Sequence, residues 1–177
     1  MADRSPRARG LKDTVLLIAA GILLNILLAK VPGLIGAPLF LDSVGTILVA
    51  ALGGYMPGIV VGVASNAINS IADPITIYYS AISVYIALLS TYFSQRGMFS
   101  KLRTAMAGAL LLALVGGGLG SLLTWSLSGF AVGSGISTPY ADALIDAGGF
   151  DPFPAQLLAD LGIDVLDKLA TMLIVLA

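Results

Sequence analysis

The chain has 177 residues, of which 58% are hydrophobic and 11% are charged, and it contains 21 glycines. A soluble domain of this length does not need so much apolar sequence to fill its core, so the composition indicates an integral membrane protein. The absence of cysteine excludes disulfides, thiol catalysis and cysteine-based metal sites. The formal net charge is −1, and the basic residues form no stripe, which argues against nucleic-acid binding.

Six apolar stretches can be membrane helices, because a helix needs roughly 20 residues to cross the hydrocarbon, and fewer where its ends snorkel. In chain order they cover approximately residues 13–30, 39–54, 56–72, 75–94, 104–128 and 154–177. The first lacks a small-x-small cleavage site, which favours a retained helix over a signal peptide. The predicted fold class is therefore all-α: a bundle of six transmembrane helices in a single domain, residues 1–177.

Two clusters of Lys and Arg orient the predicted helices. They comprise Arg4, Arg7, Arg9 and Lys12 before the first stretch, and Arg96, Lys101 and Arg103 near mid-chain. Short basic loops stay on the cytoplasmic side, so residues 1–12 and both termini should be cytoplasmic. Residues 129–153 contain no Lys or Arg and should form an extracellular loop. A loop of this length is either a simple linker or a lid over a binding site.

Polar residues gather in the outer half of the third stretch, where Asn66, Asn69 and Asp73 share one helical face. Such side chains are costly at membrane depth unless they pair or line a watery cavity. Hydrogen bonding between helices and substrate binding are both open. The predicted substrate-binding residues are those at the same outer level: Asp42, Asn66, Asn69, Asp73, Tyr78, Tyr79 and Trp125. For the aromatic residues, interfacial anchoring is the alternative.

Four charged residues interrupt the last apolar stretch: Asp160, Asp164, Asp167 and Lys168. Asp164 and Lys168 have the spacing of a favourable helical ion pair. We therefore expect a structural ion pair that involves Asp164, Asp167 and Lys168. A substrate contact or a coupling carboxylate is the alternative for these residues.

Several catalytic signatures are missing from the sequence. It contains no histidine, no Gly-x-Ser-x-Gly elbow and no phosphate-cradling Gly-x-x-x-x-Gly-Lys motif. We therefore expect no enzymatic activity, no cofactor and no metal site. Any ATP chemistry must come from a partner.

Residues 38–46, PLFLDSVGT, and residues 52–66, LGGYMPGIVVGVASN, resemble the substrate-binding S component of energy-coupling factor (ECF) transporters. Residues 164–169, DVLDKL, are similar to a last-helix pattern in some bacterial members. The resemblance implies a small six-helix protein of the bacterial plasma membrane that captures a vitamin or related micronutrient in a cavity near the outer surface. It also implies a transmembrane coupling (T) subunit and two cytoplasmic ATPase subunits as partners.

One feature departs from that family. Members that share a coupling module often carry Ala-x-x-x-Ala on the first helix, whereas Gly21, Asn25 and Ala29 occupy the nearest equivalent here. Two other functions stay open. One is a ligand-sensing transmembrane domain of a larger signalling protein. In that case, we expect the natural chain to continue beyond residue 177. The other is a purely structural membrane subunit.

Overall fold

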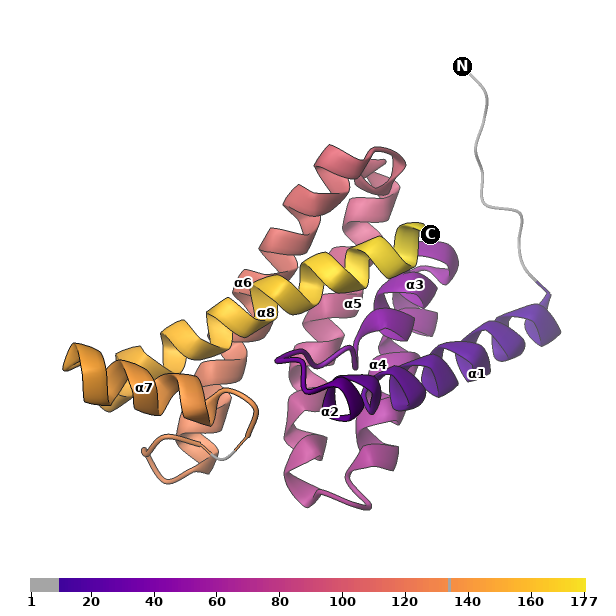
Figure 1. The fold of residues 1–177 in the computed structure, drawn as a ribbon. Helices are drawn as coiled ribbons and strands as arrows, with labels where there is room; N and C mark the ends of the chain where they lie inside the picture. The colour runs from indigo at the N-terminus through magenta and orange to yellow at the C-terminus, as the bar shows by residue number, and fades with distance from the viewer. Residues whose placement is uncertain (1–9, 134) are drawn as a thin grey trace.

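The computed structural model describes residues 10–133 and 135–177, and every regular element in this part of the chain is a helix (Figure 1). The elements are α1 (Leu11–Leu28), α2 (Val31–Ile35), α3 (Val44–Gly53), α4 (Tyr55–Asn69), η1 (Pro74–Tyr79), α5 (Ser80–Gln95), η2 (Met98–Ser100), α6 (Leu102–Leu127), α7 (Thr138–Gly148) and α8 (Pro152–Leu176). The all-helical class is confirmed. Arg4, Arg7 and Arg9 of the first basic cluster lie outside the described residues.

Three helical stretches are long and apolar enough to cross a membrane: Leu11–Ile35, Pro74–Gln95 and Leu102–Leu127. The described part of the chain is thus all-helical, with three candidate membrane-spanning segments. α3 has 10 residues, and its length of about 15 Å is half the thickness of the hydrocarbon layer. α8 has 25 residues but contains the four charged residues noted above.

The breaks between helices have local causes. Gly54 joins α3 to α4 with a φ of 87°, and Gly97 follows α5 with a φ of 70°, a backbone region that favours glycine. Asp73 precedes η1, and its Oδ1 accepts a hydrogen bond from the backbone N–H of Ile75 at 3.3 Å. Gly54 ends the predicted stretch 39–54, and Asp73 and Gly97 lie in the gaps that follow the stretches 56–72 and 75–94.

The predicted loop 129–153 contains a helix, α7, that the sequence analysis did not predict. α7 begins with Pro139 in its first turn and lies along the start of α8 (Figure 1). Ala141 of α7 is fully buried and packs against Ala155 and Ala159 of α8. Small side chains on both helices allow this close contact, so about half of the expected loop is an ordered helical hairpin with α8.

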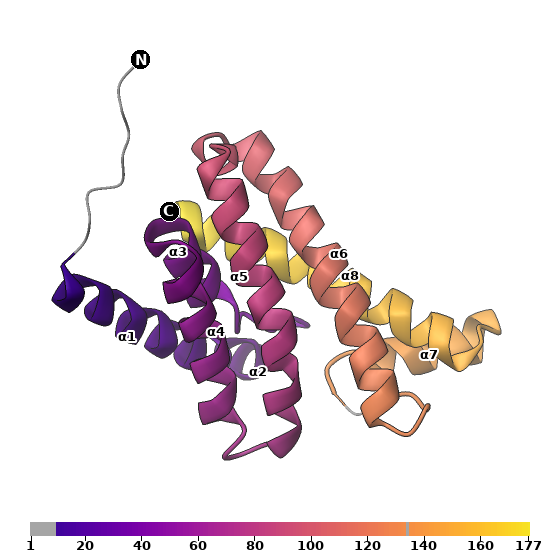
Figure 2. The same cartoon turned by 180° about the vertical axis from the view of Figure 1, so that it is seen from behind.

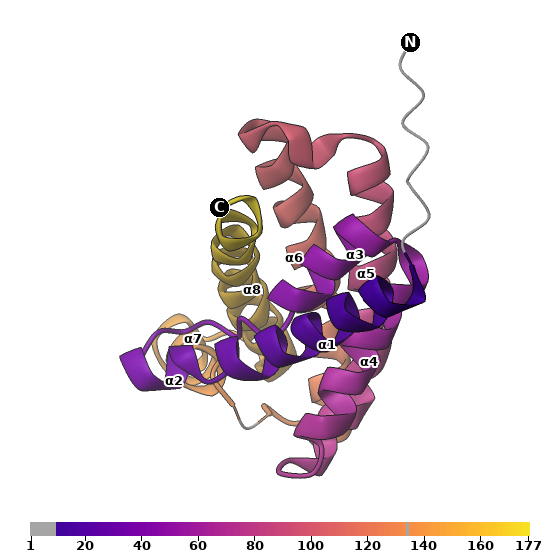
Figure 3. The same cartoon turned by 90° about the vertical axis from the view of Figure 1, so that its right-hand side faces the viewer.

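The helices form two groups that meet along α5 and α6. α4, α5 and α6 run side by side, whereas α1 and α8 cross them obliquely (Figures 1 and 2). α1 packs on α3 and α4, and α8 packs on α6. In Figure 3, α8 is seen nearly end-on beside α6, whereas α1 lies across the view near α3 and α4. The core between α5, α6 and α8 includes Ile82, Ile86, Leu112 and Met172.

The two ends of the molecule differ in composition. The α3–α4 and α5–α6 turns lie at one end, where the Tyr55 hydroxyl donates a hydrogen bond to Gln95 Oε1 at 3.2 Å. The basic residues Arg96, Lys101 and Arg103 belong to this end. The segment 70–79 and the end of α6 lie at the other end (Figures 1 and 2).

α1 and α3 approach each other closely through glycine. A Cβ atom on Gly45 would lie 2.0 Å from the carbonyl oxygen of Gly21. Beside this contact, the buried Asn25 side chain accepts a hydrogen bond from the Gly45 N–H at 2.7 Å and donates to Thr46 Oγ1 at 2.9 Å and Ser65 Oγ at 3.1 Å. Gly21 and Asn25 are thus covered by α3 and α4 within the chain itself.

The Gly45 contact generates a stability prediction. Gly45→Ala should lower the free energy of unfolding by about 1–3 kcal/mol, because the new methyl group must push two backbones apart. Gly118→Ala on α6 is the matched control, since a Cβ there would meet nothing within 4 Å. Thermal unfolding in detergent should show a lower Tm for Gly45→Ala and an equal or higher Tm for Gly118→Ala. Equal Tm values in both variants would contradict the close α1–α3 contact.

Candidate functional site

A cavity of about 300 Å³ lies between α4, η1, α5, α6 and α8, and residues 40–43 and 135–137 complete its wall. The polar side chains that line it are Asp42, Ser43, Asn66, Asp73, Thr76, Tyr79, Ser83, Thr124, Ser137, Asp160, Asp164 and Lys168. Phe40, Ile82, Ile86 and Ile136 add apolar surface. The lining includes Asp73, Thr76 and Thr124, so the cavity lies toward the end of the molecule opposite the basic α5–α6 turn.

The cavity brings together four of the seven predicted substrate-binding residues: Asp42, Asn66, Asp73 and Tyr79. The other three do not line it. Asn69 is half-buried at the end of α4, and the Tyr78 side chain is 56% exposed. The Trp125 ring stands edge-on against Phe153, with a centroid distance of 5.4 Å.

Asn66 joins two helices and also faces the cavity. Its Nδ2 donates a hydrogen bond to Ser83 Oγ on α5 at 2.7 Å. Gly62, one turn earlier on α4, permits this contact because a Cβ there would lie 2.8 Å from the Cβ of Ser83. The two interpretations of Asn66, as a helix-packing residue and as a cavity residue, are therefore compatible.

A second hydrogen bond closes the wall where α5 begins and α6 ends. The hydroxyl groups of Tyr79 and Thr124 lie 2.6 Å apart. This contact holds the Tyr79 ring against the cavity while satisfying its polar group. Thr124 was not among the predicted site residues, since nothing in the spacing of the apolar α6 sequence marks it.

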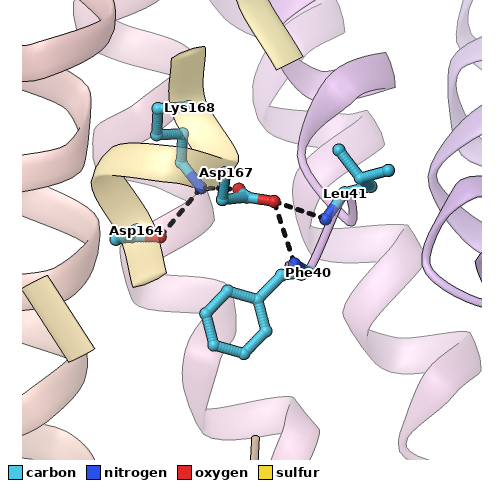
Figure 4. Close-up of polar contacts among 5 residues, drawn as sticks. All are labelled: Phe40, Leu41, Asp164, Asp167 and Lys168. Atoms are coloured by element: carbon cyan, nitrogen blue, oxygen red, sulfur yellow. Dashed lines mark hydrogen bonds and ion pairs between the residues drawn. The ribbon is translucent and has the colours of Figure 1, made fainter. Parts of the chain in front are cut away.

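Lys168 lies between two carboxylates of its own helix (Figure 4). Its Nζ is 3.1 Å from Asp164 Oδ1 and 2.6 Å from Asp167 Oδ2. All three residues are buried. A buried ion pair of this kind needs further hydrogen bonds to offset the loss of hydration.

Asp167 makes those further contacts to a segment far away in the sequence. Its Oδ1 accepts hydrogen bonds from the backbone N–H groups of Phe40 at 2.9 Å and Leu41 at 2.7 Å (Figure 4). Leu41 adopts a left-handed conformation, with a φ of 51°. α8 therefore holds residues 40 and 41 in place, and with them the adjacent cavity residues Asp42 and Ser43. The spacing of residues in the sequence does not predict this contact.

Gln156 holds Gly133 and Ser137 in the same way. The fully buried Gln156 side chain accepts a hydrogen bond from the Gly133 N–H at 3.0 Å. It donates to Ser137 Oγ at 3.0 Å and to Asp160 Oδ2 at 2.8 Å. The expected extracellular loop is thus fastened to the cavity wall by one α8 side chain that the sequence analysis also missed.

The glycines of α6 make room for Asp164. A Cβ on Gly116 would lie 2.1 Å from Asp164 Oδ2, and a Cβ on Gly117 would lie 2.9 Å from the Cα of Leu161. α8 can pack on α6 only because these side chains are absent. Asp164 Oδ2 has no hydrogen-bond partner in the part of the chain that the structure describes.

Comparison with known proteins adds no relative. A scan against protein-family models, a search of curated proteins and a search of solved structures found no match. Among residues 10–133 and 135–177, no group of three or more His, Cys, Asp or Glu residues can hold a metal ion. The site has the character of a binding cavity: apolar walls with convergent polar groups.

The Lys168 contacts generate a second stability prediction. Lys168→Met should lower the free energy of unfolding by about 3–5 kcal/mol, because it leaves two buried carboxylates without their cation. Combining Lys168→Met with Asp164→Asn should restore part of the loss, since one of those charges is removed as well. Chemical or thermal unfolding of Lys168→Met, Asp164→Asn and the double variant measures the difference. Additive losses would show that the two side chains do not interact.

Proposed function

We propose that this chain is the membrane-embedded substrate-capture subunit of an ECF-type importer and binds a vitamin or related micronutrient at the outer side. The observation that carries this proposal is the cavity. Polar groups from five helical elements converge on it in a protein whose helices can span a membrane. Polar and charged groups at membrane depth are rare unless they serve a ligand path or pair with one another.

The cavity has a size suited to a small nutrient. Its volume of about 300 Å³ is at the lower end of the range for ligand pockets. Such a space admits a vitamin-sized molecule or part of one, and it excludes a folded peptide.

The proposed topology has six membrane segments with both termini in the cytoplasm of a bacterial cell. The basic turn with Arg96, Lys101 and Arg103 would face the cytoplasm, in line with the positive-inside rule. The cavity would then open toward the outside, because its lining residues Asp73 and Thr124 belong to the opposite end of α5 and α6. α1 and α8 would cross the bilayer with a tilt relative to α5 and α6.

Import against a gradient would depend on other subunits. The sequence contains no phosphate-cradling glycine motif, so the ATP chemistry belongs to two cytoplasmic ATPases and a transmembrane coupling subunit in this proposal. The inward-facing position of Gly21 and Asn25 leaves other parts of the α1 surface for a coupling partner.

The orientation can be checked with single cysteines, because the natural chain has none. Ser100→Cys lies in the α5–α6 turn and Asp146→Cys lies on α7, and both positions are exposed. A membrane-impermeant maleimide should label Asp146→Cys in intact cells and label Ser100→Cys only after permeabilisation. The reverse pattern would place the cavity on the cytoplasmic side and contradict capture from outside.

The binding function is tested with a thermal-shift screen of purified protein against water-soluble vitamins, since a ligand that binds only the folded state raises the Tm. Asn66→Ala should weaken the best binder by up to about tenfold, because one hydrogen bond to a ligand contributes about 0.5–1.5 kcal/mol. Asn69→Ala is the matched control, since Asn69 does not line the cavity. Calorimetry should show unchanged affinity for this control.

An uptake assay in liposomes distinguishes a substrate-capture subunit from a self-sufficient carrier and from a ligand-sensing domain. Radiolabelled ligand should accumulate only when the coupling and ATPase subunits are present with ATP. Accumulation by the isolated chain would indicate a self-sufficient carrier. Binding without accumulation in the complete assembly would instead favour a ligand-sensing domain.

A further inference from the structure

The cavity carries more negative than positive charge. Four carboxylates line it, from Asp42, Asp73, Asp160 and Asp164, whereas Lys168 is its one cationic lining residue in the described part of the chain. Lys168 is already in contact with both Asp164 and Asp167. One lysine balances one negative charge, so the lining keeps a surplus of carboxylates in the described part of the chain.

The other carboxylates contact neutral groups only. Asp160 accepts a hydrogen bond from the Gln156 amide, and Asp73 accepts one from a backbone N–H. Asp42 is an exposed side chain that lines the cavity, and no ion pair to it exists among residues 10–133 and 135–177. Neutral hydrogen bonds orient a carboxylate but do not cancel its charge.

An independent observation concerns two buried polar atoms of the lining. Ser43 Oγ and Asp164 Oδ2 have no hydrogen-bond partner in the part of the chain that the structure describes, although each residue is only 4% exposed. Buried polar groups of proteins normally have partners, and a carboxylate oxygen can only accept. Each of these two atoms exposes less than 1 Å² of surface, so they mark incomplete pairing within the wall. The carboxylates of the lining call for a ligand group that donates hydrogen bonds and carries positive charge.

The arrangement favours an organic cation over a metal ion. The described carboxylates do not form a metal-holding group. They are spread around a volume of about 300 Å³, which is many times that of one ion. Two aromatic side chains, Phe40 and Tyr79, line the same space. Aromatic faces attract organic cations through their quadrupoles.

We propose that the cavity recognises an organic cation with N–H donors, such as a protonated amine or amidinium group, through Asp42 and the other carboxylates of its lining. This inference rests on the proposed capture function and specifies its substrate class. A cavity neutralised by bound protons is the competing explanation, and it predicts a preference for uncharged ligands.

The first experiment compares ligands of one shape and three charges with the full chain in detergent. Benzamidine is a cation at pH 7, benzamide is neutral and benzoate is an anion; a panel of water-soluble vitamins and their precursors, sorted by charge, is screened alongside. The expected result is that cations raise the Tm more than their neutral counterparts do, and that anions do not raise it. Equal or stronger stabilisation by neutral or anionic compounds would overturn the cation assignment and leave the capture function intact. If no compound in either set raises the Tm, both proposals fail.

The second experiment tests whether the Asp42 carboxylate binds the cation. Asp42→Asn should weaken the best cation by about tenfold or more, because a hydrogen bond to a charged group contributes more than a neutral one. The affinity for the neutral isostere of that cation should change by less than about twofold. Asp146→Asn on α7 removes an equal charge from an exposed position away from the lining and should leave both affinities unchanged. Equal losses for the cation and its isostere would show that Asp42 acts only structurally, and would overturn the proposal.

Discussion

The contact between Asp167 and the backbone of Phe40 and Leu41 determines where the cavity wall lies. It joins residues separated by more than 120 positions in the chain, at distances of 2.9 and 2.7 Å. The carboxylate that makes it is fixed in turn by Lys168. A buried charge cluster is weak support for stability by itself, because dehydration opposes the Coulombic attraction. Its clearer consequence here is that it fixes the position of Asp42 and Ser43, because these two residues directly follow the anchored residues.

Close packing on either side of the cavity depends on small residues and on buried amides. Gly45 lets α1 and α3 meet, and Gly116 and Gly117 let α8 meet α6. Between helices in a membrane, apolar surface gains little from leaving lipid, so short backbone distances and hydrogen bonds supply the attraction. Asn25 on one side and Gln156 on the other provide these hydrogen bonds. The cavity lies between two groups of helices that are each held by such contacts.

The local pattern of the sequence predicted the helices well and the contacts poorly. Apolar runs and turn residues such as Gly54 and Asp73 mark the ends of helices, because these signals act within a few residues. Periodicity places Asn66 and Asn69 on one face, but it does not say that only Asn66 is opposite Ser83. The contacts of Asp167 and Gln156 depend on which segments meet in the fold, and α7 packs through an alanine whose partners lie on α8.

The same polar atoms that define the cavity also reduce the stability of the free protein. Each buried group without a partner costs about 1–3 kcal/mol relative to a hydrogen-bonded one. Asp164 Oδ2 and Ser43 Oγ are such groups in the described part of the chain. Because Asp164 contacts Lys168, and Lys168 contacts Asp167, a charge placed beside Asp164 also acts on the anchor of residues 40 and 41. Under the proposed function, ligand binding and the position of the cavity wall are therefore linked through one side-chain network on α8.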